Sequence, residues 1–257
     1  MWDPEQYARY ADERSRPFGE LTSRIGARAP DVVVDLGCGV GELTATLADR
    51  WPAARVTGLD SSEEMLAAAV AVIADRDRPG LRFELGDLAG WRPAEPVDVL
   101  VSNAALQWVP GHPELLVGWV AGLAPGGWLA FQVPGNYAAP AFDLLRAQVR
   151  APRWRGRVPD VPATRVLEPA GYLDTLAALG CRVDAWETTY LHVLSGPDPV
   201  LEWSRGTALR PVLAALSASD GARFCREYAA ALREAYPPAV HGTVFPFRRI
   251  FVVAQRP

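Results

Sequence analysis

Short apolar runs alternate with amphipathic segments through the first half of the chain. Runs rich in valine and leucine predict buried strands at residues 31–36, 55–60, 81–85, 97–102 and 128–133, the last after a turn at 125–127. Helical spacing is found at 42–51 and 63–74, and residues 8–27 predict two short helices broken at Pro17. Strands separated by helix-length segments indicate an α/β fold, with a mostly parallel sheet covered on both faces by helices.

The alternation becomes less regular after residue 134. We expect helices at 142–149, 169–179, 198–216 and 222–236, and strands at 181–191 and 243–255. Helices inserted between the last two strands exceed what a minimal doubly wound sheet needs. We interpret them as a helical cap inserted near the C-terminus, at about 196–240.

The composition changes this picture through one absence, because the 257 residues include no lysine and all 26 basic side chains are arginine. Pyridoxal-phosphate Schiff-base chemistry and the phosphate-binding loop both require a lysine amine, so both are excluded. Any bound anion therefore meets planar, permanently charged guanidinium groups.

Charge and cysteine content restrict the partners and the compartment. The net charge of −4 offers no general attraction to nucleic acid or acidic membranes, and no apolar run reaches the roughly 18 to 20 residues of a membrane span. The cysteines Cys38, Cys181 and Cys225 are odd in number, and no cysteine–histidine pair has zinc-ligand spacing. With no signal-peptide pattern at the N-terminus, we expect a cytoplasmic protein without a metal.

Glycines at alternate positions follow the first predicted strand. Gly37, Gly39 and Gly41 let the backbone approach a ligand closely, at the strand end where such sheets bind ligands. The dinucleotide fingerprint would require glycine at position 42, where the chain has Glu42. Asp35 would repel a diphosphate but can receive an ammonium group. Residues Asp35, Gly37, Cys38, Gly39 and Gly41 therefore predict a cofactor with a cationic amino-acid end.

Polar residues also follow the other strands of the predicted sheet. Asp60, next to Ser61, can accept both hydroxyls of an adenosine ribose; the alternative is that Asp60 is a simple helix cap before Glu63. Ser61 or Ser62 is expected to cap the helix at 63–74. Asp87, next to Leu88, can accept from an adenine amino group, unless it is a solvated turn residue. Asn103 and Gln107 lie in segment 102–108, which is expected to pass the reactive centre.

The ordered motifs DLGCGVG at 35–41, LD at 59–60, GD at 86–87 and SNAALQWV at 102–109 resemble class I S-adenosylmethionine-dependent methyltransferases over residues 31–134. The resemblance implies a Rossmann-like seven-stranded sheet and S-adenosyl-L-methionine as cofactor. It also implies a single methyltransferase domain over 1–257, with an N-terminal helical lid at 1–30, a cofactor-binding core at 31–134 and a C-terminal part at 135–257.

Other segments are similar to the trans-aconitate 2-methyltransferases. They are the N-terminal residues 2–17 and the segments 132–136, 190–194, 202–211 and 245–254, although Gly135 and Tyr137 stand where more polar residues are expected. The family implies esterification of one carboxylate of trans-aconitate, a small tricarboxylate, with S-adenosylhomocysteine as the other product. The alternatives are O- or N-methylation of another small metabolite, or a non-catalytic RNA-associated module that binds the cofactor.

The implied reaction needs neither a lysine, which the chain lacks, nor a metal, which we do not expect. A carboxylate with a pKa of ~4 is already ionised at neutral pH, so no general base and no catalytic residue of that kind is expected. Orientation by arginine forks is needed instead. The predicted substrate-binding residues are Arg14, Arg16, Trp108, His192, Trp203, Arg210, Tyr236 and Arg249.

Some arginines keep alternative interpretations. Arg210 is as well suited to an ion pair with Glu202 or Glu227 as to a substrate contact. Arg146, Arg150, Arg153, Arg155 and Arg157 crowd into twelve residues without an acid, as a solvated basic face, a carboxylate site or a nucleic-acid patch. The negative net charge argues against nucleic acid, so a small-molecule partner is expected, with neither nucleic acid nor membrane.

Overall fold

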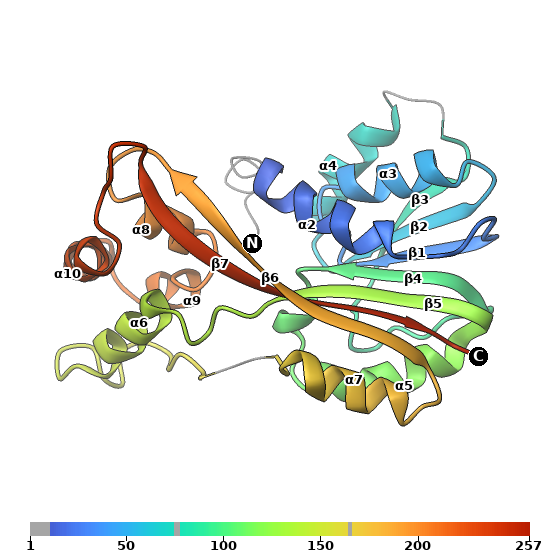
Figure 1. Ribbon diagram of the computed structural model, residues 1–257. Coiled ribbons are helices and arrows are strands. Elements are labelled where there is room, and N and C mark those ends of the chain that lie inside the picture. The colour runs from blue at the N-terminus through green and yellow to red at the C-terminus, as the bar shows by residue number, and fades with distance from the viewer. Residues whose placement is uncertain (1–10, 75–77, 164–165) are drawn as a thin grey trace. The chain divides into compact units, whose positions relative to one another are not determined.

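The computed structural model describes residues 11–74, 78–163 and 166–257 and contains one seven-stranded sheet (Figure 1). The strands, in the spatial order β3-β2-β1-β4-β5-β7-β6, are β1 (Val32–Leu36), β2 (Arg55–Asp60), β3 (Leu81–Leu85), β4 (Val97–Asn103), β5 (Leu123–Pro134), β6 (Arg182–Leu194) and β7 (Thr243–Gln255). Strands β1 to β5 pair in parallel, whereas β7 runs in the opposite direction. The predicted α/β fold with a mostly parallel seven-stranded sheet is confirmed.

The chain divides into two compact units. Unit 1 comprises Met1–Pro134, Val166–Thr188 and Ile250–Pro257, and unit 2 comprises Gly135–Arg165 and Thr189–Arg249. Strands β6 and β7 each contribute residues to both units. The division into lid, core and C-terminal part stays a prediction.

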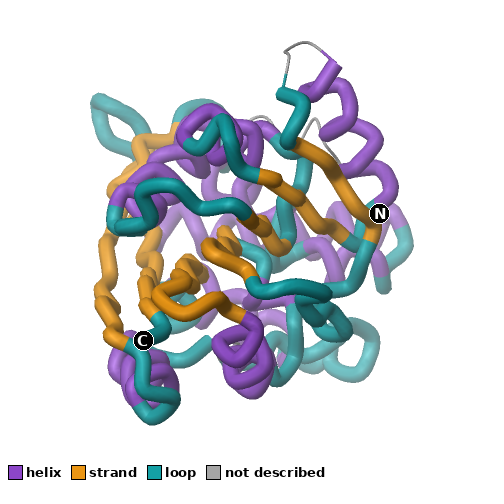
Figure 2. Tube along the Cα trace, turned by 90° about the vertical axis from the view of Figure 1, so that its right-hand side faces the viewer, coloured by secondary structure: helices purple, strands orange, loops and turns teal. Residues whose placement is uncertain are grey.

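Helices cover both faces of the sheet in unit 1. Helices α2 (Ala11–Ser23), α3 (Glu42–Arg50) and α4 (Glu63–Ala74) lie on one face, and α5 (His112–Gly122) and α7 (Pro169–Ala177) on the other (Figures 1 and 2). Alternation along β1 explains the arrangement, because Val34 and Leu36 join the core cluster that contains Trp119 and Tyr172. Asp35, between them, points the other way and accepts a hydrogen bond from Thr44 of α3.

Pro17 lies inside α2, so the prediction of two helices broken at this residue is wrong. Proline removes one backbone donor from a helix, and burial on this helix offsets the loss. Pro17, Phe18 and Leu21 are all buried, and the Thr22 hydroxyl donates to the Phe18 carbonyl at 2.9 Å. Packing against the sheet therefore outweighs the local preference of proline.

Unit 2 contains α6 (Pro140–Arg150), α8 (Pro199–Arg205), α9 (Arg210–Ala214) and α10 (Ala218–Ala235). Two short helices thus replace the single helix predicted over 198–216. Gly206 follows the last residue of α8, and Pro211 lies in the first turn of α9, where its missing N–H is tolerated. Helices occupy most of the range 196–240, and their role as a cap stays a prediction.

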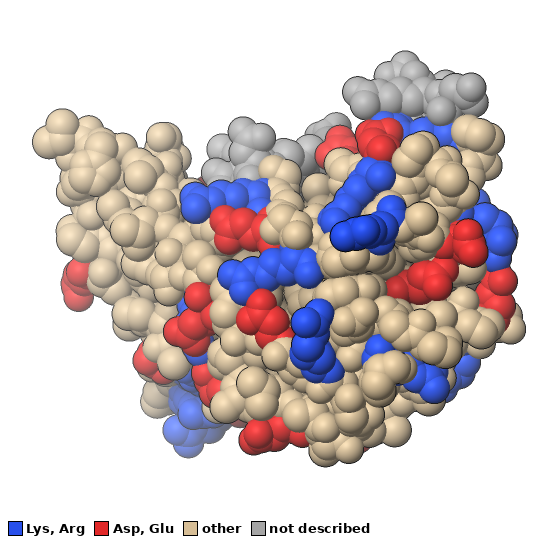
Figure 3. All heavy atoms as spheres, turned by 45° about the vertical axis from the view of Figure 1, so that its right-hand side comes forward, with Lys and Arg blue, Asp and Glu red and all other residues tan. Residues whose placement is uncertain are grey.

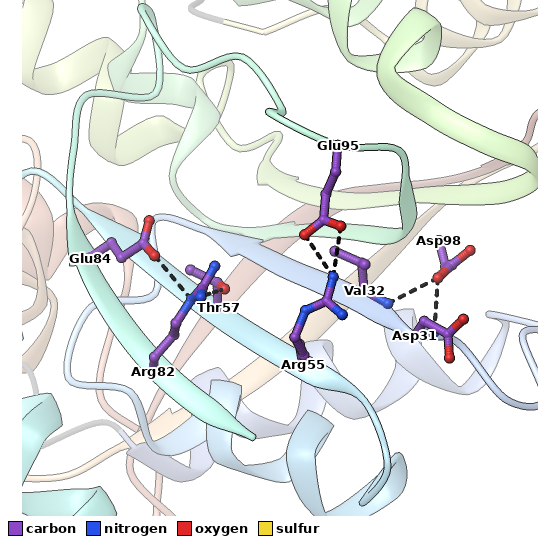
Figure 4. Close-up of polar contacts among 8 residues, drawn as sticks. All are labelled: Asp31, Val32, Arg55, Thr57, Arg82, Glu84, Glu95 and Asp98. Atoms are coloured by element: carbon purple, nitrogen blue, oxygen red, sulfur yellow. Dashed lines mark hydrogen bonds and ion pairs between the residues drawn. The ribbon is translucent and has the colours of Figure 1, made fainter. Parts of the chain in front are cut away.

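Ion pairs and backbone contacts tie together the amino ends of the strands in unit 1 (Figure 4). The Asp98 carboxylate accepts hydrogen bonds from the backbone N–H groups of Asp31 at 2.8 Å and Val32 at 2.9 Å. The Arg55 guanidinium lies 2.7 Å from both oxygens of Glu95. Asp98 therefore joins the starts of β4 and β1, and Arg55 ties the start of β2 to the segment before β4.

Candidate functional site

A pocket of about 180 Å³ opens at the carboxyl ends of the strands in unit 1. Its walls come from the loops after β1, β2, β3 and β4. The lining residues are Gly37, Gly39, Asp60, Ser61, Met65, Asp87, Leu88, Asn103, Ala104, Ala105, Trp108 and Val109. This is the edge at which open α/β sheets bind their ligands.

The glycine loop requires its glycines for two reasons. Gly37 and Gly41 have φ angles of 81° and 77°, a left-handed conformation that side chains disfavour. A Cβ atom on Gly37 would lie 2.3 Å from the Cβ of Ala105, and one on Gly41 would lie 2.4 Å from the Phe83 ring. The loop is also tied to β2, because the Gly37 N–H donates to the Leu59 carbonyl at 2.7 Å.

Asp60 is held at the end of β2 by two backbone donors. Its carboxylate oxygens accept from the N–H groups of Gly39 and Ser62, each at 2.9 Å. The Ser62 hydroxyl in turn accepts from the Met65 N–H at 3.3 Å, as the capping residue of α4 does. Since Ser62 forms the helix cap, the Asp60 carboxylate is left facing the pocket, with lone pairs available to ligand hydroxyls.

The loop after β4 supplies the opposite wall. Asn103 is 9% exposed, and its Oδ1 atom has no hydrogen-bond partner within the described part of the protein. An unpaired buried acceptor in a pocket wall is suited to a donor on a ligand. Trp108, 37% exposed, lines this pocket too. Trp108, predicted to bind the substrate, thus lines the same pocket as residues predicted to bind the cofactor.

Asp35 is buried behind the glycine loop and does not line the pocket. Its Oδ2 atom accepts from the Thr44 hydroxyl at 2.6 Å, while Oδ1 has no hydrogen-bond partner among the described residues. Desolvation is the main cause that raises the pKa of Asp35 to about 7. The hydrogen bond from Thr44 lowers this pKa, and the nearby charge of Asp60 raises it by a smaller amount. Burial, with the nearby carboxylates, also raises the pKa of the Cys38 thiol.

The pocket brings together most of the residues predicted for the cofactor, namely Gly37, Gly39, Asp60, Ser61, Asp87, Leu88 and Asn103. Asp35, Cys38, Gly41 and Gln107 are not in its lining, and their cofactor contacts stay predictions. The lining residues missed from the sequence are Met65, Ala104, Ala105 and Val109. Ala104, Ala105 and Val109 lie within or beside the SNAALQW segment, and this motif could have indicated them. Met65 is an apolar residue in a predicted helix, and nothing else in the sequence points to it.

Several residues predicted to bind substrate gather in unit 2. His192 stacks on Trp203 at a centroid distance of 4.9 Å, and both are buried. Tyr236 is buried, and its hydroxyl accepts from the Ala141 N–H at 3.0 Å. Arg249 is 4% exposed, with its guanidinium carbon 4.9 Å from the Phe247 ring centre. These positions describe an aromatic cluster with one buried cation.

The other predicted arginines have different surroundings. Arg16 is exposed and pairs with Glu20 at 3.0 Å, and the Arg14 side chain lies outside the described residues. Arg210 is half-buried in α9. Of its two suggested partners, Glu202 pairs with Arg205 at 3.0 Å, and Glu227 pairs with Arg223 at 3.4 Å.

Three arginines of the crowded run, at residues 146–157, form ion pairs with acids from outside it. Arg146 pairs with Asp143, Arg150 with Asp160, and Arg157 with Asp220. On the face shown in Figure 3, basic and acidic side chains likewise lie interspersed. The pairing favours a solvated surface over a nucleic-acid patch at this run.

Throughout the described ranges, no helix combines the length and apolar character needed to cross a membrane. In the same ranges, no three His, Cys, Asp or Glu side chains are placed to hold a metal ion together.

Comparison with known proteins places the chain among methyltransferases. Residues 33–127 match the methyltransferase domain family. The chain is 54% identical to a trans-aconitate 2-methyltransferase of Streptomyces avermitilis, over 99% of this chain and 97% of that protein. Its fold is similar to the YcgJ protein of Bacillus subtilis, with a TM-score of 0.61, 13% identity and coverage of 94% and 98%. A Haemonchus contortus phosphoethanolamine N-methyltransferase solved with S-adenosylhomocysteine gives a TM-score of 0.58, 16% identity and coverage of 94% and 52%.

This strand order, with a glycine loop and an acidic residue at the ends of β1 and β2, defines the class I S-adenosylmethionine-dependent methyltransferases, and the chain is an enzyme of this class. Its cofactor is S-adenosyl-L-methionine. Within the class, the full-length identity shows that the chain belongs to the trans-aconitate 2-methyltransferase family.

Proposed function

We propose that the chain transfers the methyl group of S-adenosylmethionine to one carboxylate of trans-aconitate, releasing S-adenosylhomocysteine and a monomethyl ester. The observation that carries this proposal is the 54% identity, along nearly the whole chain, to a relative of that activity. The cofactor supplies a methyl group already activated on a sulfonium. The protein has to bind both molecules, orient the carboxylate and exclude water.

The residues of the unit 1 pocket suit the cofactor. The lone pairs that the Asp60 carboxylate keeps beside its two backbone hydrogen bonds suit ribose hydroxyls, and Asp87 suits the adenine amino group. The buried Oδ1 of Asn103, which has no hydrogen-bond partner among the described residues, suits the ammonium of the amino-acid end. Gly37 and Gly39 leave room for the ligand against the backbone. Ser61 and Leu88 complete the walls, and we keep Asp35, Cys38, Gly41 and Gln107 as supporting residues of the same site.

No proton has to be removed from the nucleophile. A carboxylate with a pKa of ~4 is ionised at neutral pH, so binding and orientation are sufficient. We propose Arg249 as the main carboxylate-binding residue, since the residue is buried and its guanidinium carbon lies 4.9 Å from the Phe247 ring centre. A sheltered charge-assisted hydrogen bond contributes roughly 1.5–3 kcal/mol. Arg14, Arg16 and Arg210 are further candidates for carboxylate binding, and we keep Trp108, His192, Trp203 and Tyr236 as candidate substrate-binding residues.

Transfer of a labelled methyl group tests the proposal. Purified enzyme with methyl-labelled S-adenosylmethionine should label trans-aconitate, and mild base should release the label, as it does from an ester. Labelling of a neutral phenol with none on trans-aconitate would assign a different acceptor. Arg249→Lys should raise the KM for trans-aconitate about tenfold and leave cofactor affinity unchanged, because the ammonium keeps the charge but loses the fork. Arg205→Lys, at an exposed ion pair in the same unit, is the matched control.

A further inference from the structure

Ala104 has a backbone conformation that an alanine rarely adopts. Its φ angle is 54°, and Asp198 is the other non-glycine residue with a positive φ in the described chain. The left-handed conformation costs free energy, because the Cβ atom approaches the following carbonyl oxygen. Such strain persists only where surrounding contacts hold it, and it is concentrated at functional sites. Ala104 lines the cofactor pocket.

Two hydrogen bonds hold the peptide groups on either side of Ala104. Its N–H donates to the backbone carbonyl of Gln132 in β5 at 2.9 Å. Its carbonyl accepts from Nε2 of Gln107 at 2.5 Å. The first bond continues the pairing of β4 with β5, so it follows from the sheet. The second comes from a side chain and depends on the residue at position 107.

Gln107 is directed away from the pocket that its neighbours line. It lies in the short helix η1 (Leu106–Trp108), is 6% exposed and is not in the lining, whereas Ala105 and Trp108 are. The Gln107 amide therefore reaches back from η1 to the strained residue three positions earlier. Its contact with the pocket is indirect, through the Ala104 backbone.

The segment that Gln107 fastens lies close to the glycine loop. The Ala105 side chain occupies the space beside Gly37, where an added Cβ would meet it at 2.3 Å. Asn103, whose buried Oδ1 has no hydrogen-bond partner among the described residues, is on the other side of Ala104. A relaxed Ala104 would change the direction of the chain between these two wall residues.

We propose that Gln107 is a positioning residue for cofactor binding: its Nε2–H bond to the Ala104 carbonyl holds the left-handed turn that sets Asn103 and Ala105 in the pocket wall. The role deepens the methyltransferase assignment and needs only the cofactor pocket. It is independent of the acceptor molecule. It differs from the direct cofactor contact expected of Gln107 from sequence.

A double-mutant cycle with glycine at position 104 tests this role, because glycine adopts the left-handed conformation without strain. We measure the Kd of S-adenosylhomocysteine by calorimetry for the parent, Gln107→Met, Ala104→Gly and the double variant. With Ala104 present, Gln107→Met should weaken binding about tenfold. In the Ala104→Gly background, the same change should weaken it less than threefold. This loss of the effect is not expected of a residue that contacts the cofactor directly.

Gln148→Met is the matched control, because the Gln148 amide also donates to a backbone carbonyl, that of Phe224 at 2.8 Å, in unit 2. Its Kd should stay within twofold of the parent. Gln107→Asn keeps the amide but shortens its reach by one methylene, so it should lose affinity like Gln107→Met and serves if the latter does not fold. An unchanged Kd in both position-107 variants, or an equal loss in the parent and Ala104→Gly backgrounds, would overturn the proposal. Since trans-aconitate takes no part, failure here is separate from failure of the acceptor assignment.

Discussion

The sheet of unit 1 has two ends, one formed by the amino ends of its strands and one by their carboxyl ends. We call them the amino edge and the carboxyl edge; they differ in how far their polar side chains are hydrogen-bonded. At the amino ends, the Asp98 carboxylate accepts from two backbone N–H groups and the Arg55 guanidinium contacts both oxygens of Glu95 (Figure 4). These side chains are exposed or half-buried, and none of them contributes to the buried unpaired atoms found in the described residues. At the amino edge, these polar groups thus find their partners within the protein itself.

At the carboxyl ends, three buried acceptor atoms have no hydrogen-bond partner in the described part of the chain. They are Oδ1 of Asp35, Oδ1 of Asn103 and Oε1 of Gln107. Leaving a buried polar group unpaired costs about 1–3 kcal/mol. The carboxyl ends of the strands therefore give up stability that the amino ends retain, and the cost falls beside the pocket proposed for the cofactor.

The largest expected difference between the two edges is the effect of an added methyl group on ligand affinity. Gly37→Ala places a Cβ 2.3 Å from Ala105 at a φ of 81°, so we expect the Kd of S-adenosylhomocysteine to rise at least a hundredfold. Gly126→Ala is the matched control at the amino end, with a φ of 76° and no atom within 4 Å of the added Cβ. It should cost about 1 kcal/mol of stability and leave the Kd unchanged. Equal losses of affinity in both variants would remove the distinction between the edges.

The strands left two kinds of signal in the sequence: β1, β2 and β4 are mostly buried and rich in apolar residues, whereas β3, the outermost strand on one side of the sheet, alternates apolar and charged residues. β2, β3 and β7 have the predicted bounds, and β1 differs by one residue. Helix α5 was missed because its exposed side is also largely apolar, with Val117 51% exposed, so the sequence shows no amphipathic stripe. The turn expected at 125–127 became an irregularity within β5, where the pairing with β4 shifts register.

The candidate site was predictable where a strand end fixes the position of a side chain. Asp60 and Asn103 end strands, Asp87 lies two residues past the end of β3, and all three line the pocket. Gln107 lies a turn beyond, in η1, where the direction of each side chain depends on the left-handed Ala104. No sequence pattern predicts that an alanine takes this conformation, so the indirect role of Gln107 needed coordinates.

The buried carboxyl group of Asp35 should also show in the pH dependence of stability. Burial raises the pKa of Asp35 from 3.8 to about 7, so the native state binds a proton more tightly than the unfolded chain. The contribution of Asp35 to the free energy of unfolding is therefore full below about pH 4 and is lost as the pH rises to about 7. Asp35→Asn should stabilise the protein at pH 8, by on the order of 2 kcal/mol, and flatten this slope.

Urea unfolding between pH 4 and 8 measures the effect, with the cofactor absent. Thr44→Val removes the hydrogen bond that lowers the pKa of Asp35, so it should extend the slope to higher pH. Parallel curves for the parent and Asp35→Asn over this range would show that the buried carboxyl carries no such cost.

The smallest expected effect comes from two matched substitutions. Asp60 at the carboxyl edge and Asp98 at the amino edge each accept hydrogen bonds from two backbone N–H groups. Asp60→Ala removes the partner of Gly39 and Ser62 and should weaken S-adenosylhomocysteine binding about tenfold, the loss expected when ribose hydroxyls lose a charged acceptor. Asp98→Ala removes the partner of Asp31 and Val32 and should cost about 1–2 kcal/mol of stability with no change in Kd. Calorimetric Kd values and urea midpoints for both variants, read together, assign each carboxylate. If Asp60→Ala changes only the midpoint, its carboxylate braces the loop as Asp98 braces β1, and the ribose contact is wrong.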